Sequence, residues 1–388
     1  MRGFTVGRVF GIPIRLDLTF LLILPVFAWV VGSQVGYWTE ILNGTWGLNL
    51  LATPLESGST PWVLGLVGAI GLFVGVILHE LGHSVVAMRY GYPIDSITLW
   101  LLGGVAQLQD QPEDWRHEFA IAVAGPVVSI LLGVGSYLAL FVVPPSLNSL
   151  RFLLGYLALM NIVLAVFNLL PGFPMDGGRV LRALLARTRP FARATQIAAE
   201  VGKGFAILLG LVGLLGPNFI LIALAFFIYI GASSEAQRTT MNAAFENVAV
   251  RDIMTPREQI DAVDPGLSVA ELVEQMFRQR HTGYPVMDGG RLVGIVTLED
   301  AREVSQVERD AYIVEDIMTD EIQSIDANSN AMEAFEEMQR GGIGRLVVTD
   351  EGELVGLISR TDLMTALDII KQSGGRPERF TDLQPQRG

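Results

Sequence analysis

The sequence predicts two parts: a multi-pass α-helical membrane domain of about six transmembrane helices with short β elements, and a soluble α/β module built from two repeats. Composition predicts the first part, because 51% of the 388 residues are hydrophobic and only 17% are charged, too apolar for an ordinary cytosolic protein. Charge marks the second part, since residues 246–388 hold 28 Asp and Glu against 14 Lys and Arg in a chain of net charge −13. This acidic tail argues against direct nucleic-acid binding, which needs clustered Lys and Arg.

Six apolar segments are candidate membrane spans, because a straight helical span needs about 20 such residues. They are 18–32, 62–88, 119–143, 152–170, 197–215 and 218–232. Basic residues recur in alternate loops: Arg2, Arg8 and Arg15 precede the first segment, whereas the loop 33–61 has none. Cytoplasmic loops are enriched in Lys and Arg, so the alternation predicts a cell-membrane protein with both termini in the cytoplasm. Segment 18–32 lacks a small-residue cleavage pattern and is interpreted as an anchor, not a signal peptide.

Two short segments beside these spans, 4–17 and 96–108, show strand-like alternation with turn residues. Both fall on the predicted cytoplasmic side. A sheet there could offer an edge to an extended peptide, and a simple interfacial loop is an equally open interpretation.

The strongest chemical signal is His79-Glu80-Leu-Gly-His83, at the end of an apolar run that begins at Trp62. Residues four apart share a helix face, so the two imidazoles can bind one metal ion while Glu80 lies beside it. Ionisable groups at membrane depth are costly and mark function. The chain has no Cys, so a transition metal must be bound by His and carboxylate.

A second motif follows the fourth span: Asn168-Leu-Leu-Pro-Gly-Phe-Pro-Met-Asp176-Gly-Gly. Asp176 is the only acidic residue between Glu118 and Glu200. Broken backbone at membrane depth is tolerated only where it is buried in protein or lines a polar cavity. A catalytic zinc site takes three protein ligands and leaves one position for water, so Asp176 is the expected third ligand. Alone, the Asp-Gly-Gly triplet would be typical of a turn or a helix start.

These motifs, with the intervening Ala124-Gly125-Pro126, resemble the site-2 protease family of intramembrane zinc metalloproteases over about residues 1–235. The resemblance implies one Zn²⁺ per chain and cleavage of peptide bonds within or near transmembrane segments of other membrane proteins. The expected substrate is a single-span protein such as a membrane-tethered regulator, in regulated intramembrane proteolysis. Glu80 is the expected general base. Asn168 matches the family's asparagine, which is thought to help hold substrate or the oxyanion.

The tail contains an internal repeat. Asp252-Ile-Met-Thr recurs at Asp316, and Leu292-Val-Gly-Ile-Val-Thr-Leu-Glu-Asp recurs at Leu354 as Leu-Val-Gly-Leu-Ile-Ser-Arg-Thr-Asp. Each copy predicts a strand, a helix, two strands joined by a tight turn, and a helix. Two copies side by side can bury a face that neither covers alone.

The copies resemble tandem cystathionine-β-synthase-type (CBS) domains over 246–305 and 310–370. That family commonly binds adenine nucleotides or S-adenosylmethionine, and Thr297 with Asp300, and Ser359 with Asp362, match its ribose-binding pattern. The resemblance implies nucleotide-linked or dimer-linked regulation of the protease, and a homodimer through the pair. An open alternative is a dimerising scaffold whose carboxylates cap helices.

The predicted organisation is therefore a membrane domain at 1–235, a linker at 236–245, the two repeats, and a disordered tail at 372–388. Two other functions stay open at this point: a CBS-regulated channel or transporter, and a catalytically inactive substrate-binding membrane protein. Six spans are few for a chloride-channel architecture, and an inactive relative would normally lose Glu80 or a ligand. This sequence has Glu80 and all three expected zinc ligands, His79, His83 and Asp176.

Overall fold

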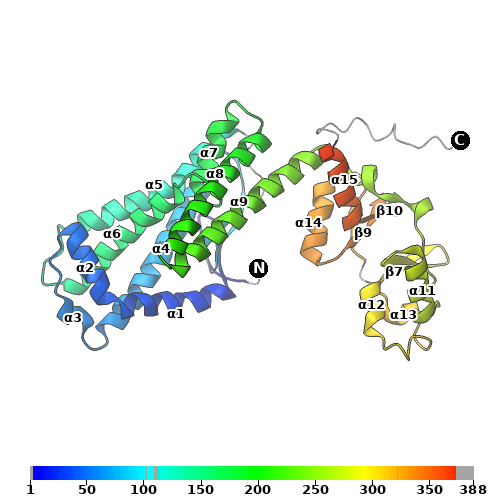
Figure 1. Cartoon of the computed structure of the whole chain (residues 1–388), viewed down its shortest axis with the longest axis horizontal. Coiled ribbons are helices and arrows are strands. Elements are labelled where there is room, and N and C mark those ends of the chain that lie inside the picture. The colour runs from blue at the N-terminus through cyan, green and yellow to red at the C-terminus, as the bar shows by residue number, and fades with distance from the viewer. Residues whose placement is uncertain (1–2, 101–102, 109–111, 113, 321, 373–388) are drawn as a thin grey trace. The chain divides into compact units, whose positions relative to one another are not determined.

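The computed structural model describes residues 3–100, 103–108, 112, 114–320 and 322–372. The chain divides into two compact units, Met1–Gln237 and Arg238–Gly388 (Figure 1). The disordered tail expected over 372–388 lies, from residue 373 onward, outside the described residues.

Five helices in the described part of the chain are long and apolar enough to cross a membrane. They are α4 (Thr60–Arg89), α5 (Trp115–Ala139), α6 (Asn148–Asn168), α8 (Phe191–Leu215) and α9 (Phe219–Phe245). No more than 33% of any apolar window is buried inside the protein, so most of these apolar side chains require lipid around them. A sixth span exists if α1 (Leu18–Ser33) and α2 (Val35–Trp46), which meet at 69°, are counted as one bent span. The predicted multi-pass helical domain is confirmed.

The segment 33–61, expected as a loop, contains two helices, α2 and the short α3 (Ala52–Glu56). Val35, Thr39 and Leu42 recur at helical spacing and are buried. Val35 and Leu42 belong to the same buried cluster as Phe152 and Tyr156 of α6. Tertiary packing against α6 therefore stabilises a helix in a segment whose composition resembles a loop.

The predicted strand segments form one four-stranded sheet in the order β1-β2-β3-β4. The strands are β1 (Gly3–Val9), β2 (Ile12–Asp17), β3 (Ile94–Trp100) and β4 (Gly103–Leu108). β1 and β2 pair antiparallel, β2 and β3 pair parallel, and β3 and β4 pair antiparallel. β4 is therefore an edge strand of the sheet, as β1 is on the other side.

Helix α4 lies between this sheet and α5. Leu81 is buried with Ile12 of β2 and Ile97 of β3, and Phe73 is buried with Leu99 of β3. A helix turns about 100° per residue, so the histidines two positions before and after Leu81 face away from the sheet. The sheet and α5 thus fix the rotation of α4 about its axis.

The second unit contains the two predicted repeats, which are confirmed. Its sheets have the orders β5-β10-β9-β8 and β6-β7. Its elements are α10 (Val250–Ile253), β5 (Thr255–Pro256), η1 (Arg257–Gln259), α11 (Val269–Gln279), β6 (Gly283–Asp288), β7 (Arg291–Thr297), α12 (Leu298–Glu303), α13 (Val314–Ile317), β8 (Ser324–Asp326), α14 (Ala331–Gly341), β9 (Arg345–Asp350), β10 (Glu353–Ser359) and α15 (Arg360–Gln372).

The two repeats exchange their leading segments. Val250, near the start of the first repeat, is buried in the core of the second, and Val314, near the start of the second, is buried in the core of the first. The exchange extends to the strands, because β5 pairs with β10 of the second repeat. The core of each repeat is therefore completed by residues from the start of the other.

The residues 236–245, expected as a linker, are the C-terminal part of helix α9. Met241 and Phe245 are buried in the core of the second repeat. The connection between the units is therefore helical, and its end belongs to the second unit.

Candidate metal centre

Three metal-binding side chains converge in the first unit, as the sequence predicts. The Nε2 atoms of His79 and His83 lie 3.1 Å apart, and each residue is 3% exposed. Oδ2 of Asp176 lies 3.0 Å from Nε2 of His79 and 3.1 Å from Nε2 of His83. Among the described residues this is the group of His and carboxylate side chains that could hold a metal ion.

The opposite nitrogen of each imidazole is bound by helix α5. Nδ1 of His79 lies 2.9 Å from the hydroxyl of Ser129, and Nδ1 of His83 donates to the carbonyl of Ile121 at 2.7 Å. Such outer partners fix the tautomer and the ring orientation of a metal-binding histidine. With Nδ1 occupied on both rings, Nε2 is left to face Asp176.

Gly125 provides the space for the two rings. A Cβ on this residue would lie 2.2 Å from Nε2 of His83 and 2.7 Å from Nε2 of His79. Any side chain there would displace the imidazoles. The Ala124-Gly125-Pro126 segment, which carries part of the family resemblance, therefore has a steric reason to contain glycine.

Asp176 is placed by a tightly packed segment between α6 and α7 (Asp176–Ala186). A Cβ on Gly177 would lie 2.2 Å from the carbonyl oxygen of Leu170, and one on Gly172 would lie 2.4 Å from Cα of Gly202 in α8. Only glycine permits such close backbone contact. Gly172, Phe173 and Met175 of this irregular segment are buried in protein, and a membrane domain tolerates irregular backbone where it is so buried.

Glu80 lies beside the edge strand β4. A Cβ on Gly104 would lie 2.6 Å from Cγ and 3.3 Å from Cδ of Glu80. The strand therefore passes directly over the residue expected as general base, one position along α4 from His79.

Comparison with known proteins agrees with this arrangement. Residues 67–152 and 145–209 match peptidase family M50, and residues 250–306 and 314–369 each match the CBS domain. A zinc metalloprotease of Methanocaldococcus jannaschii is 35% identical over 364 residues, covering 94% of this chain and 96% of the relative. The chain belongs to peptidase family M50.

A further relative supports the same assignment. The candidate zinc metalloprotease Rip3 of Mycobacterium tuberculosis is 30% identical over 401 residues, covering 98% of this chain and 96% of the relative. A solved site-2 protease from M. jannaschii is 36% identical in sequence, covers 61% of this chain and 95% of that chain, and has a TM-score of 0.42. This M50 protein is a multi-pass zinc metalloprotease of the site-2 protease type with tandem CBS domains.

Helix α6 of this M50 domain carries two asparagines, Asn161 and Asn168. The Nδ2 group of Asn168 donates to the carbonyl of Leu164 in its own helix at 3.0 Å, so its substrate-binding role stays a prediction. Asn161, one of the residues that the sequence did not single out, is 3% exposed, and its Oδ1 has no partner among the described residues. A Cβ on Gly75, one turn before His79, would lie 2.9 Å from that oxygen.

The four residues expected to bind a ligand in the CBS pair form helix caps. Oδ2 of Asp300 accepts from the backbone and the hydroxyl of Thr297, each at 2.7 Å. Oδ2 of Asp362 accepts from the backbone of Ser359 at 2.8 Å and from its hydroxyl at 2.6 Å. The helix-capping role that the sequence left open is therefore present in both repeats. It uses Oδ2 of each aspartate, and each carboxylate also has Oδ1.

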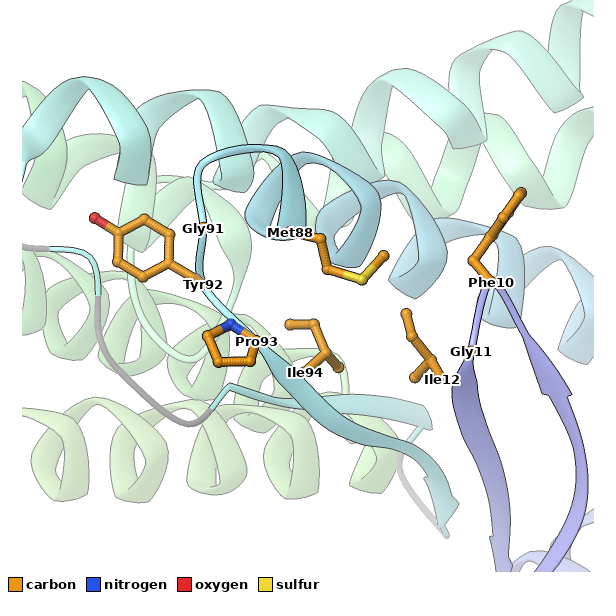
Figure 2. A pocket seen from close by; sticks show the side chains of 8 residues that line it. All are labelled: Phe10, Gly11, Ile12, Met88, Gly91, Tyr92, Pro93 and Ile94. Carbon is orange, nitrogen blue, oxygen red and sulfur yellow. The ribbon is translucent and has the colours of Figure 1, made fainter.

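An open pocket of about 400 Å³ lies at the C-terminal end of α4 (Figure 2). Figure 2 shows Met88 of α4, Ile94 of β3 and Phe10 of the β1–β2 turn around it. Its lining among the described residues is apolar apart from Tyr92, with no His or carboxylate. The side chains that line this pocket therefore include none of the metal donors.

Proposed function

We propose that His79, His83 and Asp176 hold one Zn²⁺ and that Glu80 is the general base in hydrolysis of peptide bonds within or near transmembrane segments of membrane-protein substrates. The supporting observation is the convergence of Nε2, Nε2 and Oδ2 while both Nδ1 atoms are bound by α5. Two imidazoles and one carboxylate are a donor set of catalytic zinc sites. A zinc ion bound there supplies a Lewis acid that lowers the pKa of water and polarises the scissile carbonyl.

The protein's own groups perform the proton transfers. Glu80 accepts a proton from the attacking water and returns it to the amide nitrogen as the peptide C–N bond breaks. Burial between α4, α5 and the 169–176 segment limits the entry of bulk water, since the Asp176 side chain is only 12% exposed. The three donors hold their positions while Glu80 exchanges protons.

The test is Glu80→Gln in the full-length protein, with a purified single-span substrate. We expect the variant to bind one zinc ion per chain, as the unaltered protein does, and to lose about 10²–10⁴-fold in cleavage rate, the usual contribution of a general base. Retained cleavage would remove Glu80 from the mechanism. If the unaltered protein contained no zinc and conducted ions, the channel or transporter alternative would be favoured. If the unaltered protein bound zinc but cleaved no substrate, the inactive binding protein would be favoured.

Substrate binding by strand addition is part of the same proposal. A transmembrane helix must unwind before its amides can be attacked, and an edge strand can pair with the extended form. β4 is an edge strand and Gly104 lies against Glu80. Proline substitutions through 96–108 should weaken substrate binding and turnover, and unchanged turnover across the series would rule out strand pairing.

Regulation through the CBS pair completes the proposal. The pair binds an adenine nucleotide with contributions from Thr297, Asp300, Ser359 and Asp362, both termini lie in the cytoplasm, and two chains associate through the pair. The supporting pattern is the repeated hydroxyl and carboxylate at equivalent helix starts. Isothermal titration of the full-length protein with AMP, ATP and S-adenosylmethionine tests this, and no heat for any of them would reject ligand sensing. Mass photometry in detergent tests the dimer.

A further inference from the structure

A group of three charged residues, two of them buried and one partly buried, lies in the first unit beside the segment that carries Asp176. Arg182 of α7 is 4% exposed, and its Nε and Nη2 donate to Oε1 of Glu118 in α5 at 2.6 and 2.5 Å. Its Nη1 donates to Oε1 of Glu235 in α9 at 2.6 Å. Arg182 therefore joins three helices through one guanidinium.

Aromatic rings cover the same guanidinium. Its Cζ lies 4.9 Å from the ring centroid of Phe173 and 4.7 Å from that of Phe191. Phe173 lies three residues before Asp176 and Arg182 lies six residues after it. The guanidinium thus contacts the chain on both sides of the third metal donor.

Helix α5 connects this group to the two histidines. Glu118, Ile121, Gly125 and Ser129 are spaced by three or four residues, so they lie along one face of the helix. Ser129 and the Ile121 carbonyl bind the imidazoles, and Glu118, less than one turn before Ile121, binds Arg182. One face of α5 therefore contacts both imidazoles and the arginine of α7.

Stability alone does not account for these charges. Buried ion pairs are often replaced by apolar residues of similar size without loss of stability, so a retained pair is more readily explained by the geometry that it specifies. Oε2 of Glu118 has no partner among the described residues, which makes the arrangement costly.

We infer that Arg182 is a positioning residue of the protease. It holds α7 in register with α5, so that Asp176 meets the imidazoles, and Glu118 is its principal acceptor. The inference rests on the proposed zinc site and adds to it a residue that touches neither metal nor substrate.

The experiment measures zinc affinity of the full-length protein by chelator competition, with Co²⁺ absorption as a reporter of coordination. Arg182→Met should weaken zinc binding about 10- to 100-fold, the usual effect of losing an outer partner, and should change the Co²⁺ spectrum. Arg193→Met is the matched control, because Arg193 is exposed and its partner is Gln196. The control should leave both readouts unchanged.

A second variant covers the case in which Arg182→Met does not fold. Glu118→Leu combined with Arg182→Met removes both buried charges, and Glu235 remains 27% exposed and able to be hydrated. This double variant should have an unaltered thermal midpoint and still bind zinc about 10- to 100-fold more weakly. Zinc affinity equal to that of the unaltered protein would overturn the inference. Absence of zinc binding in the unaltered protein would overturn the proposed function and this inference with it.

Discussion

At the residue scale, Gly125 leaves no room for a methyl group beside the two imidazoles. In Gly125→Ala the new Cβ would lie 2.2 Å from Nε2 of His83, so we expect zinc affinity to fall by at least about tenfold. Gly135→Ala on the same helix is the control, because nothing lies within 4 Å of its Cβ. Zinc content after dialysis against a graded chelator series measures both. Equal zinc retention in the two variants would show that the rings can move without cost.

The metal donors could be predicted from the sequence because their signal is local. His79 and His83 are one helical turn apart, and Asp176 is an isolated carboxylate in a broken apolar segment. Their outer partners could not be predicted. Every residue has a backbone carbonyl, so nothing in the sequence marks that of Ile121. Likewise nothing marks Ser129 until α5 is placed against α4. Such contacts depend on tertiary packing, which a single sequence does not encode in a local pattern.

At the scale of the element, the exchanged segments of the repeats depend on two equivalent glycines. A Cβ on Gly356 would lie 2.5 Å from Sδ of Met254 and 2.8 Å from the carbonyl oxygen of Thr255, and a Cβ on Gly294 would lie 2.7 Å from Sδ of Met318. The methionine side chains can yield, but the Thr255 backbone belongs to the pairing of β5 with β10. This close contact is where each leading segment joins the other repeat.

Gly356→Ala should therefore destabilise the second unit by about 1–3 kcal/mol, the usual effect of overpacking. Gly344→Ala is the control in the same repeat, because no atom lies within 4 Å of its Cβ. Limited proteolysis of the full-length protein across a urea series measures the difference in the second unit. Matching proteolysis midpoints would mean that β5 shifts away without loss.

The elements that the sequence predicted well are those in which hydrophobic residues recur at a regular spacing. The long apolar helices and the alternating strands of the sheet have one, as do the strands and helices of the repeats. Helix α2 was missed because its sequence carries Tyr, Trp, Thr, Glu and Asn, and because its buried stripe is recognised only against α6. Nothing in the local sequence distinguishes Arg182 from the arginines near it, since its partners come from α5 and α9.

At the scale of the whole molecule, the boundary between the two units lies inside helix α9. Phe245 is 0% exposed in the core of the second repeat, together with Met241 and Val248. A fragment that starts at Arg238 should therefore be more stable than one that starts at Val250. Loss of a buried Phe alone costs about 3–5 kcal/mol, so the difference should be at least about 3 kcal/mol. Urea unfolding followed by circular dichroism measures both fragments, and equal stability would assign these residues to the membrane domain instead.

The reciprocal exchange of leading segments has a consequence for how such a pair can arise. A single repeat expressed alone would expose part of its core and an unpaired strand edge. The leading segment of a second, identical repeat could cover that core and pair with that edge. One repeat on its own should thus self-associate, and its homodimer would reproduce the architecture of the tandem. Gene duplication and fusion would then only have to link two repeats that could already assemble as separate polypeptides.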